Sequence, residues 1–320
     1  THFMQDSTGN GVAQDTVVSP PKYLKWTGGS TWSRSHSHMG NMPGLVAAKG
    51  RIFAILDEGF IGKDQSHAPA DWSLIARDAY NGILLWSKPI KTFHDALWGK
   101  KSGPIQLPER LVTDGDRVYA TLDIEGPLSA VDAATGELIM DYEGTNGTEE
   151  ILFNDGVLVL LRNPLRETGK HDEPIRAVKG RFGGGSPHGE NEKEIVALNA
   201  QTGRILWKHK SVVLATTLVA DGKRVCFHDG TKIVCLDRAN GKLKWNTAPV
   251  ERTRVALAKS PPELLVHRGV VLFVGGLRFD QSAQARAQKK KKDEEQGKRK
   301  NKGREDQTPQ REELKSAPKR

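Results

Sequence analysis

The sequence of 320 residues predicts an all-β fold, a β-propeller of four-stranded antiparallel blades. A hairpin-like pattern recurs four times, and a further apolar run precedes each copy behind a glycine turn. No stretch between these runs has the apolar period of about 10–15 residues that a crossover helix needs, which argues against a parallel α/β sheet. The 33 glycines and 16 prolines also suit a turn-rich protein better than a helical bundle.

Each copy of the pattern has a small residue, then Asp or Asn two positions on, Gly four later and a large apolar residue four later again. The Asp or Asn side chain can accept backbone hydrogen bonds and start a turn, and the glycine supplies a positive φ at its end. We therefore expect each copy to form the outer hairpin of one blade. The copies, at 74–86, 128–140, 195–207 and 233–245, carry Ala76, Asp78, Gly82 and Trp86; Ala130, Asp132, Gly136 and Met140; Ala197, Asn199, Gly203 and Trp207; and Cys235, Asp237, Gly241 and Trp245.

The preceding apolar runs complete each unit to about four strands. A fifth run has no hairpin after it, so we expect about four to five blades of a propeller that is incomplete in this sequence. The pattern glycines are 54, 67 and 38 residues apart, and we expect the excess spacing to be insertions at 60–72, 91–108 and 163–193. The apolar runs are 50–59, 115–126, 155–164, 221–230 and 268–279.

Charge divides the chain. Residues 281–320 contain 14 Lys and Arg against 7 Asp and Glu, whereas the rest has 34 against 32. We predict an N-terminal lead-in at 1–44, the repeats at 45–280, and a disordered basic tail or insertion at 281–320. Nucleic acid is not an expected partner, because the repeats are nearly neutral and the basic segment mixes in acids without aromatic residues. No run approaches the ~18 apolar residues of a membrane span.

The two cysteines, Cys226 and Cys235, flank an expected hairpin with a tight turn at Asp229 and Gly230. In that register Cys226 faces Ile233, and Cys235 is a diagonal neighbour at ~7–8 Å, which is long for a disulfide. We expect two small core residues rather than a disulfide or a metal site.

The repeated pattern resembles the docking motif of PQQ-like (pyrroloquinoline-quinone-type) β-propeller repeats, Ala-x-Asp-x-x-x-Gly-x-x-x-Trp. The first copy matches in full, whereas Met140, Asn199 and Cys235 depart from the motif. The resemblance covers roughly residues 45–280, and the stretches WSRSH and GTEEILFNDGVLVL resemble large PQQ-like propeller proteins of planctomycete bacteria. It implies that each Trp packs between adjacent blades, and it favours a periplasmic or exported protein.

For function, the resemblance implies a binding or scaffold platform for a protein or small-molecule partner. The alternative is a quinoprotein-type oxidoreductase that depends on PQQ and Ca²⁺. Such an enzyme would add a vicinal Cys–Cys disulfide, Ca²⁺ ligands and a catalytic Asp, and no single stretch of this sequence matches those positions. The resemblance alone therefore assigns no cofactor, since shared fold is not shared function.

Two groups of residues are candidates for a functional rim. Arg34, His36 and His38 form a polar cluster that could bind an anion or a metal, although a third metal ligand is missing nearby and a polar loop is the simpler interpretation. Asp57 and Glu58 end an expected strand and could bind Ca²⁺ or act as acid and base, or form an ordinary turn. The same alternatives hold for Glu149 and Glu150.

Overall fold

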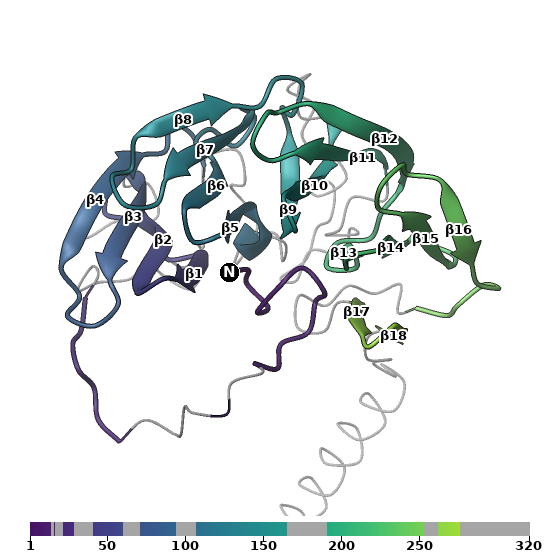
Figure 1. The fold of residues 1–320 in the computed structure, drawn as a ribbon, viewed down its shortest axis with the longest axis horizontal. Helices are drawn as coiled ribbons and strands as arrows, with labels where there is room; N and C mark the ends of the chain where they lie inside the picture. The colour runs from purple at the N-terminus through teal and green to yellow at the C-terminus, as the bar shows by residue number, and fades with distance from the viewer. Residues whose placement is uncertain are drawn as a thin grey trace, which may run out of the picture. The chain divides into compact units, whose positions relative to one another are not determined.

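The computed structural model describes residues 1–13, 16, 22–28, 41–59, 71–93, 107–164, 191–252 and 262–275. They belong to one compact unit, Thr1–Gly276. This unit holds four four-stranded antiparallel sheets and one two-stranded sheet, which we call blades 1 to 5 in chain order (Figure 1). The structure therefore confirms the predicted all-β fold of propeller blades, and within the described residues blade 5 contributes two strands.

Blade 1 consists of β1 (Gly44–Ala48), β2 (Arg51–Asp57), β3 (Trp72–Asp78) and β4 (Leu84–Pro89). Blade 2 consists of the 3-10 turn η2 (Leu107–Arg110), β5 (Leu111–Thr113), β6 (Arg117–Thr121), β7 (Leu128–Asp132) and β8 (Leu138–Asp141). Blade 3 consists of β9 (Thr148–Asn154), β10 (Val157–Arg162), β11 (Glu192–Asn199) and β12 (Ile205–Val212). Blade 4 consists of β13 (Val219–Ala220), β14 (Arg224–His228), β15 (Ile233–Asp237) and β16 (Leu243–Asn246), and blade 5 of β17 (Glu263–His267) and β18 (Val270–Val274).

Within each four-stranded blade the strands pair in chain order. The first strands of neighbouring blades contact one another, as β1 does β5 and β5 does β9, while the last strands lie on the outside (Figure 1). We call β1, β5, β9, β13 and β17 the inner strands. Because pairing is antiparallel throughout, each blade has two distinct ends.

The end where the inner strands finish also carries the four Asp/Asn–Gly hairpins, and we call it the turn end. The opposite end is where the inner strands begin, and we call it the connection end. The chain leaves and re-enters the blades at the connection end through the longer segments 60–70, 94–106, 165–190 and 253–261, which lie outside the described residues.

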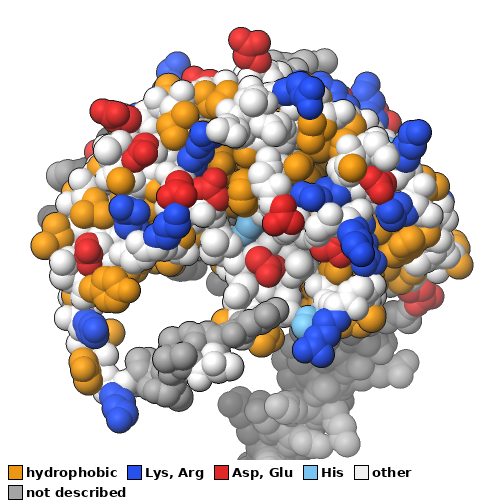
Figure 2. Space-filling model, in the orientation of Figure 1, with side chains coloured by type: hydrophobic (Ala, Val, Ile, Leu, Met, Phe, Trp, Pro, Cys, Tyr) orange, Lys and Arg blue, Asp and Glu red, His pale blue; other side chains and the backbone are white. Residues whose placement is uncertain are grey.

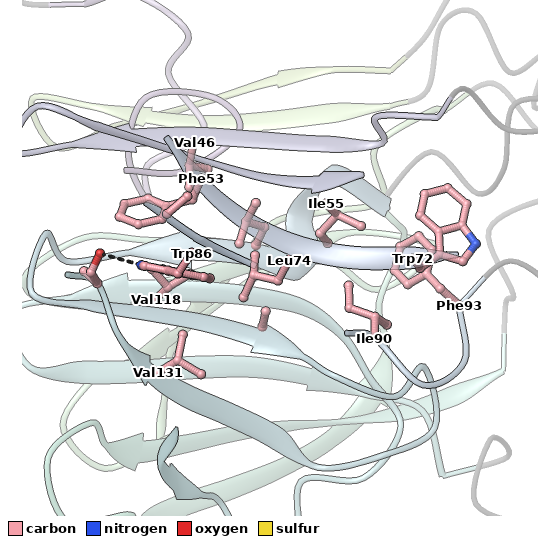
Figure 3. Close-up of a cluster of buried hydrophobic side chains, with 14 of the residues drawn as sticks. Val46, Phe53, Ile55, Trp72, Leu74, Trp86, Ile90, Phe93, Val118 and Val131 are labelled. Atoms are coloured by element: carbon pink, nitrogen blue, oxygen red, sulfur yellow. Dashed lines mark hydrogen bonds between the residues drawn. The ribbon is translucent and has the colours of Figure 1, made fainter. Parts of the chain in front are cut away.

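The core lies between adjacent blades. Four clusters of buried apolar side chains each combine neighbouring sheets, and the largest joins blades 1 and 2 through Phe53, Leu74, Trp86 and Val118 (Figure 3). Trp86 is 9% exposed, and its indole N–H donates to the Ala133 carbonyl at 3.2 Å. The blades are thus held face to face by buried apolar area.

A close approach between blades explains the pattern glycines. A Cβ on Gly136 would lie 2.7 Å from the Trp86 ring, and one on Gly241 would lie 2.7 Å from the Trp207 ring. Gly136 also has a φ of 75°, the left-handed region that favours glycine. Trp207 donates to the Arg238 carbonyl at 2.7 Å, so the same contact recurs between blades 3 and 4.

Blade 2 has Met140 where the other copies of the pattern have a tryptophan. The methyl group of Met140 takes the ring's place and lies 2.9 Å from the position of a Cβ on Gly203. The Tyr142 hydroxyl donates to the Ala200 carbonyl, three residues before that glycine, which is where an indole N–H bonds in the other copies. Two side chains therefore divide the packing and hydrogen-bonding roles of one tryptophan.

Trp26 makes the same contact outside the repeated pattern. Its indole N–H donates to the Ala79 carbonyl at 3.0 Å, and a Cβ on Gly82 would lie 2.6 Å from its ring. Residues 22–28 therefore cover the hairpin of blade 1 much as the outer strand of blade 1 covers that of blade 2.

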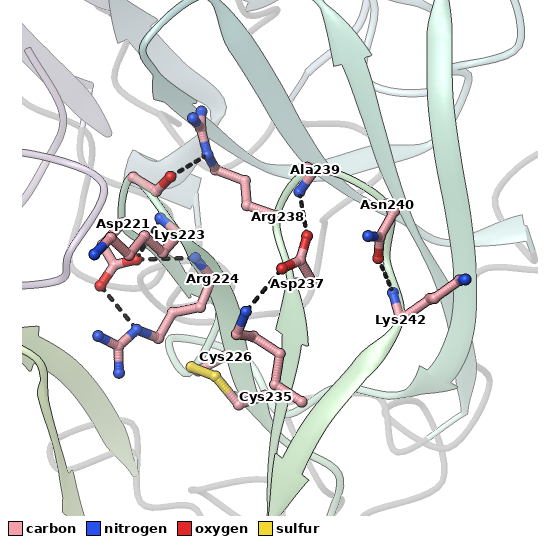
Figure 4. A network of polar contacts seen from close by, with 12 residues as sticks. Asp221, Lys223, Arg224, Cys226, Cys235, Asp237, Arg238, Ala239, Asn240 and Lys242 are labelled. Carbon is pink, nitrogen blue, oxygen red and sulfur yellow. Dashed lines mark hydrogen bonds and ion pairs between the residues drawn. A yellow bond between two sulfur atoms is a disulfide. The ribbon is translucent and has the colours of Figure 1, made fainter.

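The cysteine interpretation was wrong. Cys226 pairs directly with Cys235, their Cα atoms lie 4.2 Å apart, and they form a disulfide within blade 4 (Figure 4). The reason is the turn, which has four residues rather than two, since His228 pairs with Ile233. The Asp229 side chain accepts hydrogen bonds from the backbone amides two and three residues further on, which widens the loop and shifts the register.

The surface of the described part is mixed in charge. Figure 2 shows Lys and Arg side chains interspersed with Asp and Glu over the face that it presents. No helix among the described residues is long and apolar enough to cross a membrane.

Candidate functional site

The predicted rim residues separate in the structure. Arg34, His36 and His38 lie outside the described residues. Asp57 is fully buried at the end of β2, and its carboxylate accepts hydrogen bonds from the backbone amides of Gly59 and Asp71, each at 3.0 Å. Asp57 therefore shapes the connection after β2.

Glu58 is exposed beside Asp57, and its backbone amide donates to the Asp71 carbonyl at 2.9 Å. The described contacts of this pair are those of a strand end.

Glu149 belongs to a buried ion pair in blade 3. Its carboxylate lies 2.9 Å from the Lys193 ammonium, and both side chains are 1% exposed. Asn163 donates to the other carboxylate oxygen at 3.0 Å, so the charge is both paired and hydrogen-bonded. Since removing one partner of such a pair leaves an uncompensated buried charge, this contact fixes how β9, β10 and β11 sit at the connection end.

Glu150, the next residue on β9, is also buried and interacts electrostatically with Glu109 in η2 of blade 2. Glu109 in turn interacts with Glu263 at the start of β17, and we call Glu109, Glu150 and Glu263 the carboxyl cluster. Burial, followed by the charge of Glu109, raises the pKa of Glu150 to about 8, against the lowering effect of Lys193. Burial and then Glu263 raise the pKa of Glu109 to about 7.

Thr216 ties blade 4 into this region. Its backbone amide lies 3.4 Å from a carboxylate oxygen of Glu150, and its hydroxyl donates to the Pro262 carbonyl at 2.7 Å. Its φ of 63° lies in the left-handed region, which is an outlier for a β-branched residue. The carboxyl cluster is thus surrounded by the starting ends of the inner strands of blades 2, 3, 4 and 5.

The sequence pointed to Glu149 and Glu150 but missed Glu109, Glu263 and Thr216. These residues are far apart in the chain and none belongs to a motif, so only the side-by-side placement of the inner strands brings them together. The available signal was weak: the carboxylates lie in or next to the first strand of three separate blades.

Among the described residues, no group of three or more His, Cys, Asp or Glu is arranged to hold a metal ion. The Cys226–Cys235 disulfide joins residues nine apart in sequence and packs between blades 4 and 5, so it is not the vicinal disulfide of a quinoprotein.

Solved structures similar to this chain include BamB from Moraxella catarrhalis, with 12% identity, a TM-score of 0.36, and coverage of 72% of this chain and 60% of that one. A europium-containing methanol dehydrogenase has 12% identity and a TM-score of 0.42, with coverage of 79% and 51%. The quinohemoprotein alcohol dehydrogenase from Comamonas testosteroni has 16% identity and a TM-score of 0.39, with coverage of 76% and 40%. This chain spans less than two thirds of the length of each.

No curated protein matches the chain. Residues 70–306 match the family model of PQQ-like repeats that is described as outer membrane protein assembly factor BamB. The match includes all four hairpin copies and runs into the charged segment. The chain belongs to this family of PQQ-like repeat β-propellers.

Proposed function

We propose that this protein is a binding platform for a partner protein, and that the partner docks at the connection end of the blades. The observation that carries the proposal is the carboxyl cluster, in which Glu109, Glu150 and Glu263 from three blades gather where the inner strands begin. Connections that begin and end on a rigid sheet scaffold are where proteins place binding residues. A small-molecule partner is the second form that the proposal allows.

The two ends of the blades differ in how strongly the packing of adjacent blades constrains their residues. At the turn end, the Asp/Asn–Gly hairpins hold adjacent blades together through contacts such as Trp86 on Gly136. At the connection end, the left-handed φ of Thr216 and the buried Lys193–Glu149 pair are costly features that do not recur from blade to blade. The family description, an assembly factor, also favours a protein as partner.

The chemistry of the cluster favours a cationic group of the partner. Near pH 7 the raised pKa values leave Glu150 largely protonated and Glu109 about half protonated. A Lys or Arg side chain that enters the cluster would favour the ionised form, so binding would release protons. Affinity should then rise with pH between about 6 and 9.

The test is calorimetric titration of the whole chain with a short oligolysine peptide and with an oligoglutamate peptide of the same length. We expect oligolysine to bind with release of protons, seen as a dependence of the heat on the buffer's ionisation enthalpy. The variant E109Q/E150Q should weaken binding at least about tenfold. The matched control, Glu137→Gln, removes an exposed carboxylate at the turn end and should change little.

Two results would contradict the proposal. Equal binding of both peptides would show that charge at the connection end is not recognised. Equal loss of oligolysine affinity in E109Q/E150Q and in Glu137→Gln would show general attraction by net charge, not by the carboxyl cluster.

A further inference from the structure

We infer that the ends of the inner strands at the turn end form a peptide-binding surface, which we call the groove, and that residues 1–9 of this chain occupy it. We call these residues the strap. The inference concerns the end of the blades opposite to the carboxyl cluster and stands independently of the proposed function.

The strap forms hydrogen bonds with the backbone of several inner strands in succession. The Thr1 carbonyl accepts from the Thr113 amide of β5 at 2.9 Å. The Ser7 carbonyl accepts from the Ala220 amide of β13 at 2.7 Å, and its hydroxyl donates to the Ala220 carbonyl at 2.9 Å. The Thr8 carbonyl accepts from the Val266 amide of β17 at 2.8 Å. The strap itself is bent, with a φ of 68° at Gln5, so that its carbonyls reach the amides of separate strands.

One side chain extends the pattern to blade 3. The His2 imidazole Nε2 accepts a hydrogen bond from the Phe153 amide of β9 at 3.0 Å, and His2 is only 7% exposed. Burial lowers the pKa of His2 to about 4, so the ring is neutral near pH 7 and its Nε2 can act as an acceptor. The strap therefore accepts hydrogen bonds from backbone amides near the ends of four inner strands, in blades 2, 3, 4 and 5.

The fit is also steric. Ser7 is 1% exposed, and Gly9 adopts a φ of 72°. A Cβ on Gly9 would lie 2.6 Å from the Leu264 carbonyl oxygen and 2.8 Å from Val219 Cγ1. Only glycine meets both the conformation and the space at this point, so the groove has sequence selectivity for the segment that it holds.

These contacts place the strap across the turn end of the inner strands. Each contact bridges a different blade, so the strap also ties together inner strands that belong to separate sheets. A segment held by a few hydrogen bonds of this kind can be exchanged for another peptide that offers the same carbonyls, an acceptor at the His2 position and a glycine at position 9.

The test is hydrogen exchange on the whole chain, comparing Gly9→Val with the matched control Gly11→Val. A Cβ on Gly11 would meet only the flexible end of Met4 at 3.1 Å. We expect the amides of Thr113, Ala220 and Val266 to exchange at least about fivefold faster in Gly9→Val and at the wild-type rate in the control. Unchanged exchange in Gly9→Val would overturn the inference.

A second measurement uses a fluorescent synthetic peptide of residues 1–10. We expect it to bind the Gly9→Val chain, whose own strap is displaced, at least about tenfold more tightly than the wild-type chain, whose groove is filled. A peptide with Val at position 9 should not bind. If Gly9→Val unfolds the whole chain, Ser7→Ala removes one hydrogen bond and should still speed exchange at Ala220. No peptide binding by a folded Gly9→Val chain, or unchanged Ala220 exchange in Ser7→Ala, would contradict the inference.

Discussion

Replacing Glu150 by Gln should change how the stability of the blades depends on pH. The structure raises the pKa of this buried carboxyl from 4.5 to about 8, first through burial and then through Glu109. Between these two values the folded chain holds a proton that the unfolded chain has released. The stability contributed by this proton is fully present below about pH 4.5 and is lost as the pH rises through about 8.

The size of the effect follows from proton linkage. One carboxyl contributes a slope of at most about 1.4 kcal/mol per pH unit, so the wild-type chain could lose about 4 kcal/mol of unfolding free energy between pH 5 and 8. The effective dielectric inside proteins, about 20 even at buried sites, lowers this figure, and we expect about 2 kcal/mol. Glu109 adds a loss of the same sign up to about pH 7.

Urea unfolding followed by tryptophan fluorescence, at intervals between about pH 5 and 9, measures this dependence. The Glu150→Gln chain should match the wild type within about 1 kcal/mol at pH 5 and be more stable by about 2 kcal/mol at pH 8 and above. The control Glu137→Gln should keep the wild-type slope, since that side chain is exposed. A Glu150→Gln curve parallel to the wild-type curve would show that Glu150 titrates normally and that the cluster is not formed.

The remaining predictions concern stability at fixed pH. Trp207→Ala should cost about 3–5 kcal/mol in urea unfolding, because the ring is 8% exposed between blades; a near-neutral value would refute its docking role. Trp26→Ala should lower the melting temperature in calorimetry if residues 22–28 act as an outer strand, whereas an unchanged value would place them outside the fold. Tyr142→Phe should cost only about 1 kcal/mol in urea unfolding, because the carbonyl that it bonds also accepts from Arg117; a loss as large as that of Trp207→Ala would contradict this. Reduction of the Cys226–Cys235 disulfide should cost about 2–3 kcal/mol in urea unfolding, and two free thiols by titration of the unreduced chain would disprove the bond.

The blades were predictable because each hairpin repeats the same local chemistry. Asp132 accepts hydrogen bonds from the amides of Ala134 and Thr135, which lowers the pKa of its carboxyl, and Asn199 makes the equivalent bonds in the next blade. Such turns depend on neighbours in sequence, so a sequence pattern can reveal them. The predicted pairing register of the cysteine hairpin was wrong, because a four-residue loop and a two-residue loop share the same Asp-Gly signal.

The contacts that set blade against blade were only partly visible in the sequence. The exchange of roles between Met140 and Tyr142 depends on two residues that no repeat pattern pairs, and Trp26 has no glycine four residues before it and no aspartate eight residues before it to mark it as part of the pattern. Both contacts are defined by a partner in another blade. Sequence periodicity reports which face of a strand is buried, but not which distant residue covers it.

The same distinction explains why Glu109, Glu263 and Thr216 escaped prediction. Blade docking uses a small set of residues at fixed spacing. The residues of the turn-end hairpins are therefore constrained by packing in each four-stranded blade, and their repetition indicates a structural role. At the connection end the inner strands begin with different residues in each blade: Glu109 comes before β5, Glu150 lies within β9, and Thr216 comes before β13. Departures from a repeat are where selection for something other than packing can act. This is why we propose the connection end, and not the repeated hairpins, as the place where a partner protein docks.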